Sequence, residues 1–289
     1  MMTEDLLKKV RKIEIKTKRL SRNIFSGQYH SAFKGRGMAF SEVREYMFGD
    51  EVRSIDWNVT ARYNHPYVKV FEEERELTVI LLIDVSGSTF FGTKSNLKSD
   101  IITEIAAVIS FSAIQNNDKV GVIFFSDKVE KYIPPKKGSS HILRIIRELI
   151  TYKHSDSKTS FSEPLKFMNN VIKKQSTCFL ITDGLGEFDD SLEILSRKHD
   201  LSTILVNDIA EREIPDLGLV LLHDNETNED IWVDTSDKKL ISSYRKNSEE
   251  RSSKLQNKFK RIGIDYINVE TNKDYIPLLM QLFQKGGRK

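Results

Sequence analysis

The sequence predicts an α/β fold with a doubly wound, mostly parallel sheet. From residue 77 onward, short β-branched runs alternate with amphipathic stretches, the pattern of a parallel sheet covered by helices on both faces. The 289 residues suit one such domain with additions better than two complete domains. Hydrophobic residues make up 39% and charged residues 30%, so the composition is that of an ordinary globular protein.

The individual elements follow from runs and periods along the chain. Strands are expected where apolar β-branched residues cluster, at 77–85, 119–126, 128–134, 176–183, 201–208 and 264–270. Helices are expected between them, at 99–116, 140–152, 162–173, 188–199, 241–262 and 274–285. Only Ser126 and Asp127 separate the second and third strands, which leaves no room for a crossover helix and predicts an antiparallel edge strand. Two alternating runs around polar turn residues predict an inserted β-hairpin at about 218–235.

Residues 1–76 follow a different pattern and form a predicted N-terminal extension to the domain at 77–289. A basic, helix-prone arm covers 3–24, and residues 1–40 carry ten Lys and Arg against three Asp and Glu. Such an arm could meet nucleic acid or anionic lipid. A solvated helix face is the favoured interpretation, because no aromatic residues alternate with the basic ones. No nucleic acid partner is therefore expected.

Several classes of protein are disfavoured by composition. The longest aliphatic run covers 79–83, far short of the roughly 20 apolar residues that span a bilayer. The N-terminus lacks the apolar segment of a secretory signal peptide. Cys178 is the single cysteine, so no disulfide or thiolate metal site is possible within one chain. The expectation is a cytoplasmic protein without a membrane span.

Oxygen-bearing side chains gather after the first predicted strand, in the stretch LLIDVSGST. The spacing of Asp84, Ser86 and Ser88 places all three in one loop, as a hard divalent cation needs. Ligands of open parallel sheets bind outside the carboxyl ends of the strands. We therefore expect a site for Mg²⁺ or Mn²⁺ formed by Asp84, Ser86, Ser88, Thr159 and Asp183. The alternative is a plain strand-to-helix turn in which Ser88 caps the next helix.

This residue set resembles the metal-ion-dependent adhesion site of von Willebrand factor A domains, in residue types, order and place on the chain. The resemblance implies a von Willebrand factor A-like, Rossmann-like sheet. In that family two serines and a threonine touch the metal directly, and two aspartates act largely through water. By resemblance the direct contacts fall to Ser86, Ser88 and Thr159, and the water-mediated ones to Asp84 and Asp183.

The resemblance has a physical consequence for the expected ligand. With few direct carboxylate ligands, the cation keeps much of its positive charge and an exchangeable position. An Asp or Glu of a partner can then complete the coordination shell. One place departs from the family pattern, which often has two glycines before the threonine, where this chain has Ser157 and Lys158 before Thr159.

A second resemblance lies upstream, in GRGMAFSEVREYMFGDEVRSIDWNVTAR, which is followed by an expected strand into the sheet. This stretch resembles the signature of family 58 of the bacterial domains of unknown function, whose members carry a von Willebrand A-like domain and are commonly paired with MoxR-type AAA+ ATPases. The motif residues are Gly35, Gly37, Phe40, Arg44, Tyr46, Gly49, Asp50, Arg53, Ile55, Asp56, Trp57, Ala61 and Arg62.

The charged residues of this signature admit two interpretations. They could be catalytic, or they could form a half-buried ion-pair network that pins the N-terminal segment to the sheet. The network is favoured, because no base, nucleophile and orienting group stand out as a triad. The residues concerned are Arg44, Asp50, Arg53, Asp56, Trp57 and Arg62.

The function expected from these patterns is a non-enzymatic adaptor that binds an acidic residue of a partner protein through a bound metal ion. By resemblance the partner is a MoxR-type AAA+ ATPase or a client of that ATPase. The alternative is a metal-dependent hydrolase acting at the same strand ends. An aspartyl-phosphate enzyme would have a second Asp where this chain has Ser86, and no other nucleophile is evident.

Overall fold

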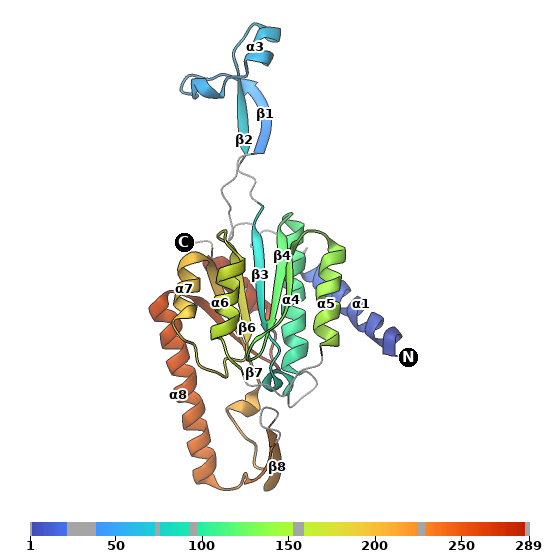
Figure 1. Ribbon diagram of the computed structural model, residues 1–289, viewed down its shortest axis with the longest axis vertical. Helices are drawn as coiled ribbons and strands as arrows, with labels where there is room; N and C mark the ends of the chain where they lie inside the picture. Colours follow the sequence, from blue (N-terminus) through green and yellow to red (C-terminus); the bar gives the residue numbers. More distant parts are fainter. Residues whose placement is uncertain are drawn as a thin grey trace. The chain divides into compact units, whose positions relative to one another are not determined.

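The computed structural model describes residues 2–21, 39–72, 76–92, 97–152, 159–224 and 229–286 (Figure 1). It divides the chain into two compact units. We call Met1–Phe33 with Thr78–Lys289 the sheet unit, and Lys34–Leu77 the small unit. The sequence predicted a boundary after residue 76, and the structure places it after Leu77. The prediction that residues 1–76 form one extension is wrong, since the N-terminal helix belongs to the sheet unit.

A six-stranded sheet forms the centre of the sheet unit, in the order β10-β7-β6-β3-β4-β5. All neighbouring pairs are parallel except β4 with β5, which confirms the antiparallel edge strand. The six expected strands are all present and differ from the prediction only at their ends. Their bounds are β3 Thr78–Asp84, β4 Lys119–Phe125, β5 Val129–Lys136, β6 Thr177–Thr182, β7 Asp200–Asn207 and β10 Asp265–Glu270.

The expected helices cover both faces of this sheet. One face carries α6, α7 and α8, which contribute Leu165, Leu192 and Phe259 to a buried cluster with Ile80 of β3. On the other face Phe283 of α9 packs edge-on against Phe179 of β6, with ring centroids 6.1 Å apart. The bounds are α4 Lys98–Gln115, α5 Ser139–Thr151, α6 Ser162–Val171, α7 Ser191–Lys198, α8 Lys238–Ile262 and α9 Ile276–Gly286.

The N-terminal helix α1 (Met2–Leu20) packs against α4 and α5. It buries Val10 and Ile13, while Lys16 reaches Glu104 of α4 at 2.5 Å. The expected basic arm is therefore an amphipathic helix with one face in the core of the sheet unit. No helix within the described residues is long and apolar enough to cross a membrane.

The strand order reverses beside β3, and this reversal positions the candidate site. From β3 the chain passes to β4 on one side, and it later returns to β6 on the other side. Asp84 ends β3 and Asp183 directly follows β6, so both lie at the carboxyl edge of the sheet where the order reverses. Such switch points are the usual ligand sites of open α/β sheets.

The predicted inserted hairpin is confirmed as β8 (Leu219–Asp224) paired with β9 (Glu229–Asp234). The helix α8 follows directly, and Figure 1 shows it as the orange helix that runs from this hairpin along the sheet unit. Asp237 caps its N-terminus by accepting hydrogen bonds from the backbone N–H groups of Lys239 and Leu240. Gly263 ends it in the left-handed conformation, with φ +71°.

The small unit contains an antiparallel pair, β1 (Ala39–Glu45) with β2 (Tyr67–Glu72), and a short helix α3 (Trp57–Tyr63). A turn of 3₁₀ helix at Val52–Ser54 precedes α3. The strand expected to run from the signature into the main sheet is thus corrected, because β2 pairs with β1 in a separate sheet.

Candidate metal centre

Asp84 is fully buried at the end of β3, and both of its carboxylate oxygens accept hydrogen bonds. Oδ1 accepts from the backbone N–H of Ser86 at 3.0 Å and from its hydroxyl at 2.6 Å. Oδ2 accepts from the Thr182 hydroxyl at 2.6 Å, across from β6. The carboxylate therefore fixes the loop after β3 and joins the two strands at the switch point.

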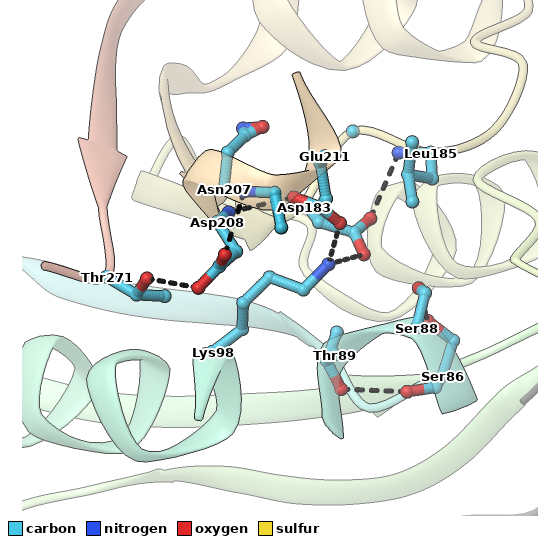
Figure 2. A network of polar contacts seen from close by, with 12 residues as sticks. Ser86, Ser88, Thr89, Lys98, Asp183, Leu185, Asn207, Asp208, Glu211 and Thr271 are labelled. Carbon is cyan, nitrogen blue, oxygen red and sulfur yellow. Dashed lines mark hydrogen bonds and ion pairs between the residues drawn. The ribbon is translucent and has the colours of Figure 1, made fainter. Parts of the chain in front are cut away.

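Ser86 and Ser88 present their hydroxyls side by side, with the two Oγ atoms 3.1 Å apart. A short 3₁₀ turn at Gly87–Phe90 holds them there, and the Thr89 hydroxyl donates to the Ser86 carbonyl at 2.7 Å (Figure 2). The alternative role of Ser88 as a helix cap is not observed, because α4 begins only at Lys98.

Thr159 lies on the same cavity as Ser88, in the segment before α6. The backbone N–H of Ser160 donates to the Ser126 carbonyl at 2.9 Å, which ties this segment to the end of β4. The Thr159 hydroxyl oxygen is buried and finds no hydrogen-bond partner among the described residues. Buried hydroxyls nearly always have a partner, so this oxygen is available to a ligand.

Asp183 is held by an ion pair that the sequence did not reveal. Its Oδ1 accepts from the backbone N–H of Leu185 at 3.0 Å. Its Oδ2 accepts from the ammonium of Lys98 at 2.9 Å, and the same ammonium lies 2.5 Å from Glu211 Oε1 (Figure 2). Asp183 and Lys98 have no exposed side-chain surface. Glu211 also accepts from the backbone N–H of Asp208 at 2.8 Å, which anchors the third member of this Lys98 triad.

Lys98 carries its positive charge at a buried position that would by itself disfavour it. It is the first residue of α4, where the helix dipole disfavours a positive charge. Burial also acts to lower the pKa of Lys98, but the charges of Asp183 and Glu211 outweigh it and raise the pKa above the ordinary value. The two carboxylates therefore keep a cation inside the protein.

Charge is less well balanced at Asp84. Burial, followed by the negative charge of Asp183, raises the pKa of Asp84 to about 7, against the hydrogen bonds from Ser86 and Thr182 that act to lower it. An additional positive charge at this place would favour the ionised carboxylate. A cation close to Asp84 would therefore lower the pKa of this carboxyl group.

The residues present fit a hard divalent cation. Three hydroxyls and two carboxylates are the oxygen ligands that Mg²⁺ and Mn²⁺ prefer, and the unpartnered Thr159 oxygen has no other use in the described structure. Across the described ranges, no three His, Cys, Asp or Glu side chains gather as a metal cluster. The candidate set differs from such a cluster, because hydroxyls form most of it. It consists of Asp84, Ser86, Ser88, Thr159 and Asp183.

The signature residues of the small unit form a polar network, but one confined to that unit. Arg44 contacts both oxygens of Asp50 at 2.8 Å, with its side chain 37% exposed. Asp56 caps α3 and lies 3.5 Å from the Lys69 ammonium. The described partners of Arg44 and Asp56 all lie within Lys34–Leu77. Within the described residues no ion pair involves the remaining members, and all three are exposed: Arg53, Trp57 and Arg62.

Sequence reasoning missed Lys98, Glu211 and Thr182. The partners of Lys98 lie 85 and 113 residues away along the chain, so no local pattern marks it. Thr182 directly precedes Asp183 at the end of a predicted strand, and that position alone could have suggested a hydroxyl facing Asp84.

The fold and the site together define an α/β protein with a cavity at the switch point of a mostly parallel sheet. The family model for "Protein of unknown function DUF58" matches residues 42–254. This match covers more than half of the chain, and the chain therefore belongs to that family. Both units share in the match, because it begins in the small unit and ends in α8.

The chain is also similar to proteins and solved structures from several bacteria. The uncharacterized protein Rv1480 of Mycobacterium tuberculosis is 28% identical over 222 residues, which cover 75% of this chain and 70% of the relative. BatB from Bacteroides thetaiotaomicron, a conserved hypothetical protein, covers 74% of this chain and 100% of its own with 16% identity and a TM-score of 0.49. An aerotolerance-related membrane protein from Bacteroides fragilis covers 73% of this chain and 98% of its own, with 13% identity and a TM-score of 0.46.

Proposed function

We propose that this protein is a non-enzymatic interaction module whose strand-end site holds Mg²⁺ or Mn²⁺ and binds an acidic side chain of a partner. The site then works as a metal-ion-dependent adhesion site on a von Willebrand factor A-like sheet. Ser86, Ser88 and Thr159 would hold the metal through their hydroxyls, with Asp84 and Asp183 behind them. The observation that carries this proposal is the buried, unpartnered hydroxyl of Thr159 on the same cavity as Ser88.

The charges around the site support a ligand that is itself negative. Lys98 already neutralises part of the charge of Asp183 and Glu211. Counted together, Asp84, Asp183, Glu211 and Lys98 leave two negative charges when all are ionised, as many as one divalent cation carries. The protein charge thus balances that of the cation without exceeding it, so an incoming carboxylate meets no net negative charge at the site.

The partner is, in this proposal, a MoxR-type AAA+ ATPase or a client of such an ATPase. Support comes from the resemblance of the upstream signature, whose part from residue 42 onward, with Arg44 and Asp50, lies within the family match. In this role the protein would act as an adaptor in the assembly or activation of other proteins.

A metal-dependent hydrolase at the same strand ends has less support. A pKa of about 7 would suit Asp84 to acid–base catalysis. Both of its oxygens, however, already accept hydrogen bonds from within the protein, which leaves it poorly placed to take a proton from water. Turnover of a generic phosphate ester that disappears in Asp84→Asn would reverse this ranking.

The test is capture of a carboxylate by the full chain with and without metal. The probe is a short labelled peptide of Gly and Ser with one central Glu, followed by fluorescence anisotropy in Mg²⁺ and in EDTA. We expect binding only in Mg²⁺, and none in Asp84→Asn. The matched control is Asp216→Asn, which removes an exposed carboxylate and should bind like the unaltered protein. Binding that is unchanged in EDTA would refute the proposal.

A further inference from the structure

The cavity beside the candidate metal centre has a second wall that the proposed function does not use. Its volume is about 960 Å³, a size that accommodates several residues of an extended peptide. One wall consists of strand-end loops with Ser88, Thr159 and Gly184. The opposite wall is a face of α8. This second wall comprises Tyr244, Arg251, Lys254, Leu255 and Lys258.

The helix α8 is attached to the same loops that form the candidate site. Gly184, directly after Asp183, has φ +76°, and a Cβ there would lie 3.0 Å from Leu255 Cδ2. The Ser248 hydroxyl donates to the carbonyl of Glu211 at 3.0 Å. The Lys258 ammonium donates to the carbonyl of Phe188. The distance between the two walls is therefore set by direct contacts and not by the long helix alone.

The α8 wall carries a concentrated positive charge. Arg251, Lys254 and Lys258 recur at intervals of three and four residues, so they share one face of the helix. Arg251 and Lys254 are exposed, and no described residue forms an ion pair with either of them. Glu211, on the opposite side, is already paired with Lys98.

We propose that this cavity binds a partner segment with at least two acidic side chains, of which one contacts Arg251 and Lys254. The inference rests on the proposed function for the other contact, in which a carboxylate completes the shell of the metal ion. Arg binds carboxylates through two parallel N–H donors. Glu187 also lines the cavity, but on the wall of strand-end loops, so the α8 wall itself presents only positive charge to a ligand. The ligand is thus an acidic peptide and not merely a protein with one suitable Glu.

The test compares two labelled peptides on two variants of the full chain. One peptide carries a single Glu among Gly and Ser, and the other carries a run of Glu residues of the same total length. Arg251→Gln with Lys254→Gln should weaken binding of the Glu-run peptide about tenfold in Mg²⁺. Binding of the single-Glu peptide should not change.

A matched control removes the same charge from elsewhere on α8. Arg245 and Lys246 lie on this helix outside the cavity wall and face Glu249 and Glu250, at 3.0 and 3.9 Å. Arg245→Gln with Lys246→Gln should leave the affinity for both peptides unchanged. Equal weakening by both double variants would overturn the inference, since it would indicate a general effect of net charge.

The outcomes separate this inference from the proposed function. If EDTA abolishes binding of both peptides but the Arg251 and Lys254 double variant binds the Glu-run peptide normally, the α8 contact is overturned and the proposed function stands. If EDTA has no effect and the double variant weakens binding, the α8 contact is supported and the proposed function fails. Displacement of the peptide by a lower concentration of a single-stranded oligonucleotide would overturn the assignment of an acidic peptide as ligand.

Discussion

The central strand of the sheet unit and the exposed aromatic residues of the small unit place large apolar side chains in opposite environments. In the sheet unit, every residue of Val79–Ile83 is fully buried between helices. In the small unit, Met47, Phe48, Trp57 and Tyr63 are all exposed, and Trp57 retains 67% of its surface. A sequence that looks similarly apolar in the two places therefore produces a core in one and a surface in the other.

This difference shows which forces stabilise each unit. Burial of aliphatic and aromatic surface dominates in the sheet unit, at about 25 cal/mol per Å² of apolar area. The small unit depends instead on its backbone hydrogen bonds and on polar contacts such as Arg44 with Asp50 and the cap from Asp56. Substitutions that target buried groups of the sheet unit should accordingly have the largest effects.

The largest expected effect follows from breaking the Lys98 triad. Lys98→Met keeps a similar length but leaves Asp183 and Glu211 as unpaired buried carboxylates, so the free energy of unfolding should fall by about 3–5 kcal/mol. The comparison is Lys131→Met, which removes an exposed pair with Glu148 and should cost below about 1 kcal/mol. Urea unfolding measures both, and equal losses would contradict the account.

The next effect is a pH dependence from His199, which is 2% exposed. Burial lowers the pKa of His199 to about 4, whereas the unfolded chain titrates near 6.5. Between these values only the unfolded state binds the proton, so stability falls as pH falls from about 6.5 to 4, by on the order of 3 kcal/mol in total. His199→Leu should flatten this slope in urea unfolding at several pH values. A slope that is unchanged in His199→Leu would contradict this explanation.

A smaller effect is expected at the contact between the site loop and α8. In Gly184→Ala the new Cβ would lie 3.0 Å from Leu255 and 3.1 Å from Leu205, at a φ that favours glycine. The expected loss is about 1–3 kcal/mol, measured by thermal unfolding. Gly138→Ala has φ +99° but nothing within 4 Å, so it reports backbone strain alone and should cost less. A Gly138 variant that loses more would contradict the packing explanation.

The smallest expected effect lies in the small unit. Trp57→Ser removes an exposed indole, and stability should change by no more than about 0.5 kcal/mol. Phe179→Ser, in the core of the sheet unit, provides the contrast and should destabilise by about 3–5 kcal/mol or more. A large loss of stability in Trp57→Ser, measured by thermal unfolding, would show that the two units do not differ as described.

The same contrast explains how much of the fold could be predicted. Strands and helices of the sheet unit were predicted within a few residues, because two-sided burial leaves continuous apolar runs such as 79–83 and helical periods between them. The small unit was not predicted, because Val68 is the one buried side chain among those described in it. An exposed element has no reason to show a hydrophobic period.

The residues of the candidate site also differ in how well the sequence predicts that they lie close together. Asp84, Ser86 and Ser88 lie within one loop, so their proximity follows from spacing alone. Thr159 and Asp183 could be placed only through the expected strand order. Lys98 and Glu211 were missed, since a buried ion pair between distant segments leaves no local pattern in the sequence.

Uptake of Mn²⁺ by the purified protein tests the central claim most directly. Titration calorimetry of the full chain should show one Mn²⁺ bound per molecule. The uptake should be lost in Ser86→Ala with Ser88→Ala and retained in Ser236→Ala, which alters a hydroxyl that bonds only to Asp234. Absence of Mn²⁺ uptake by the unaltered chain, or equal uptake by all variants, would contradict the assignment of a metal ion to the ends of β3 and β6.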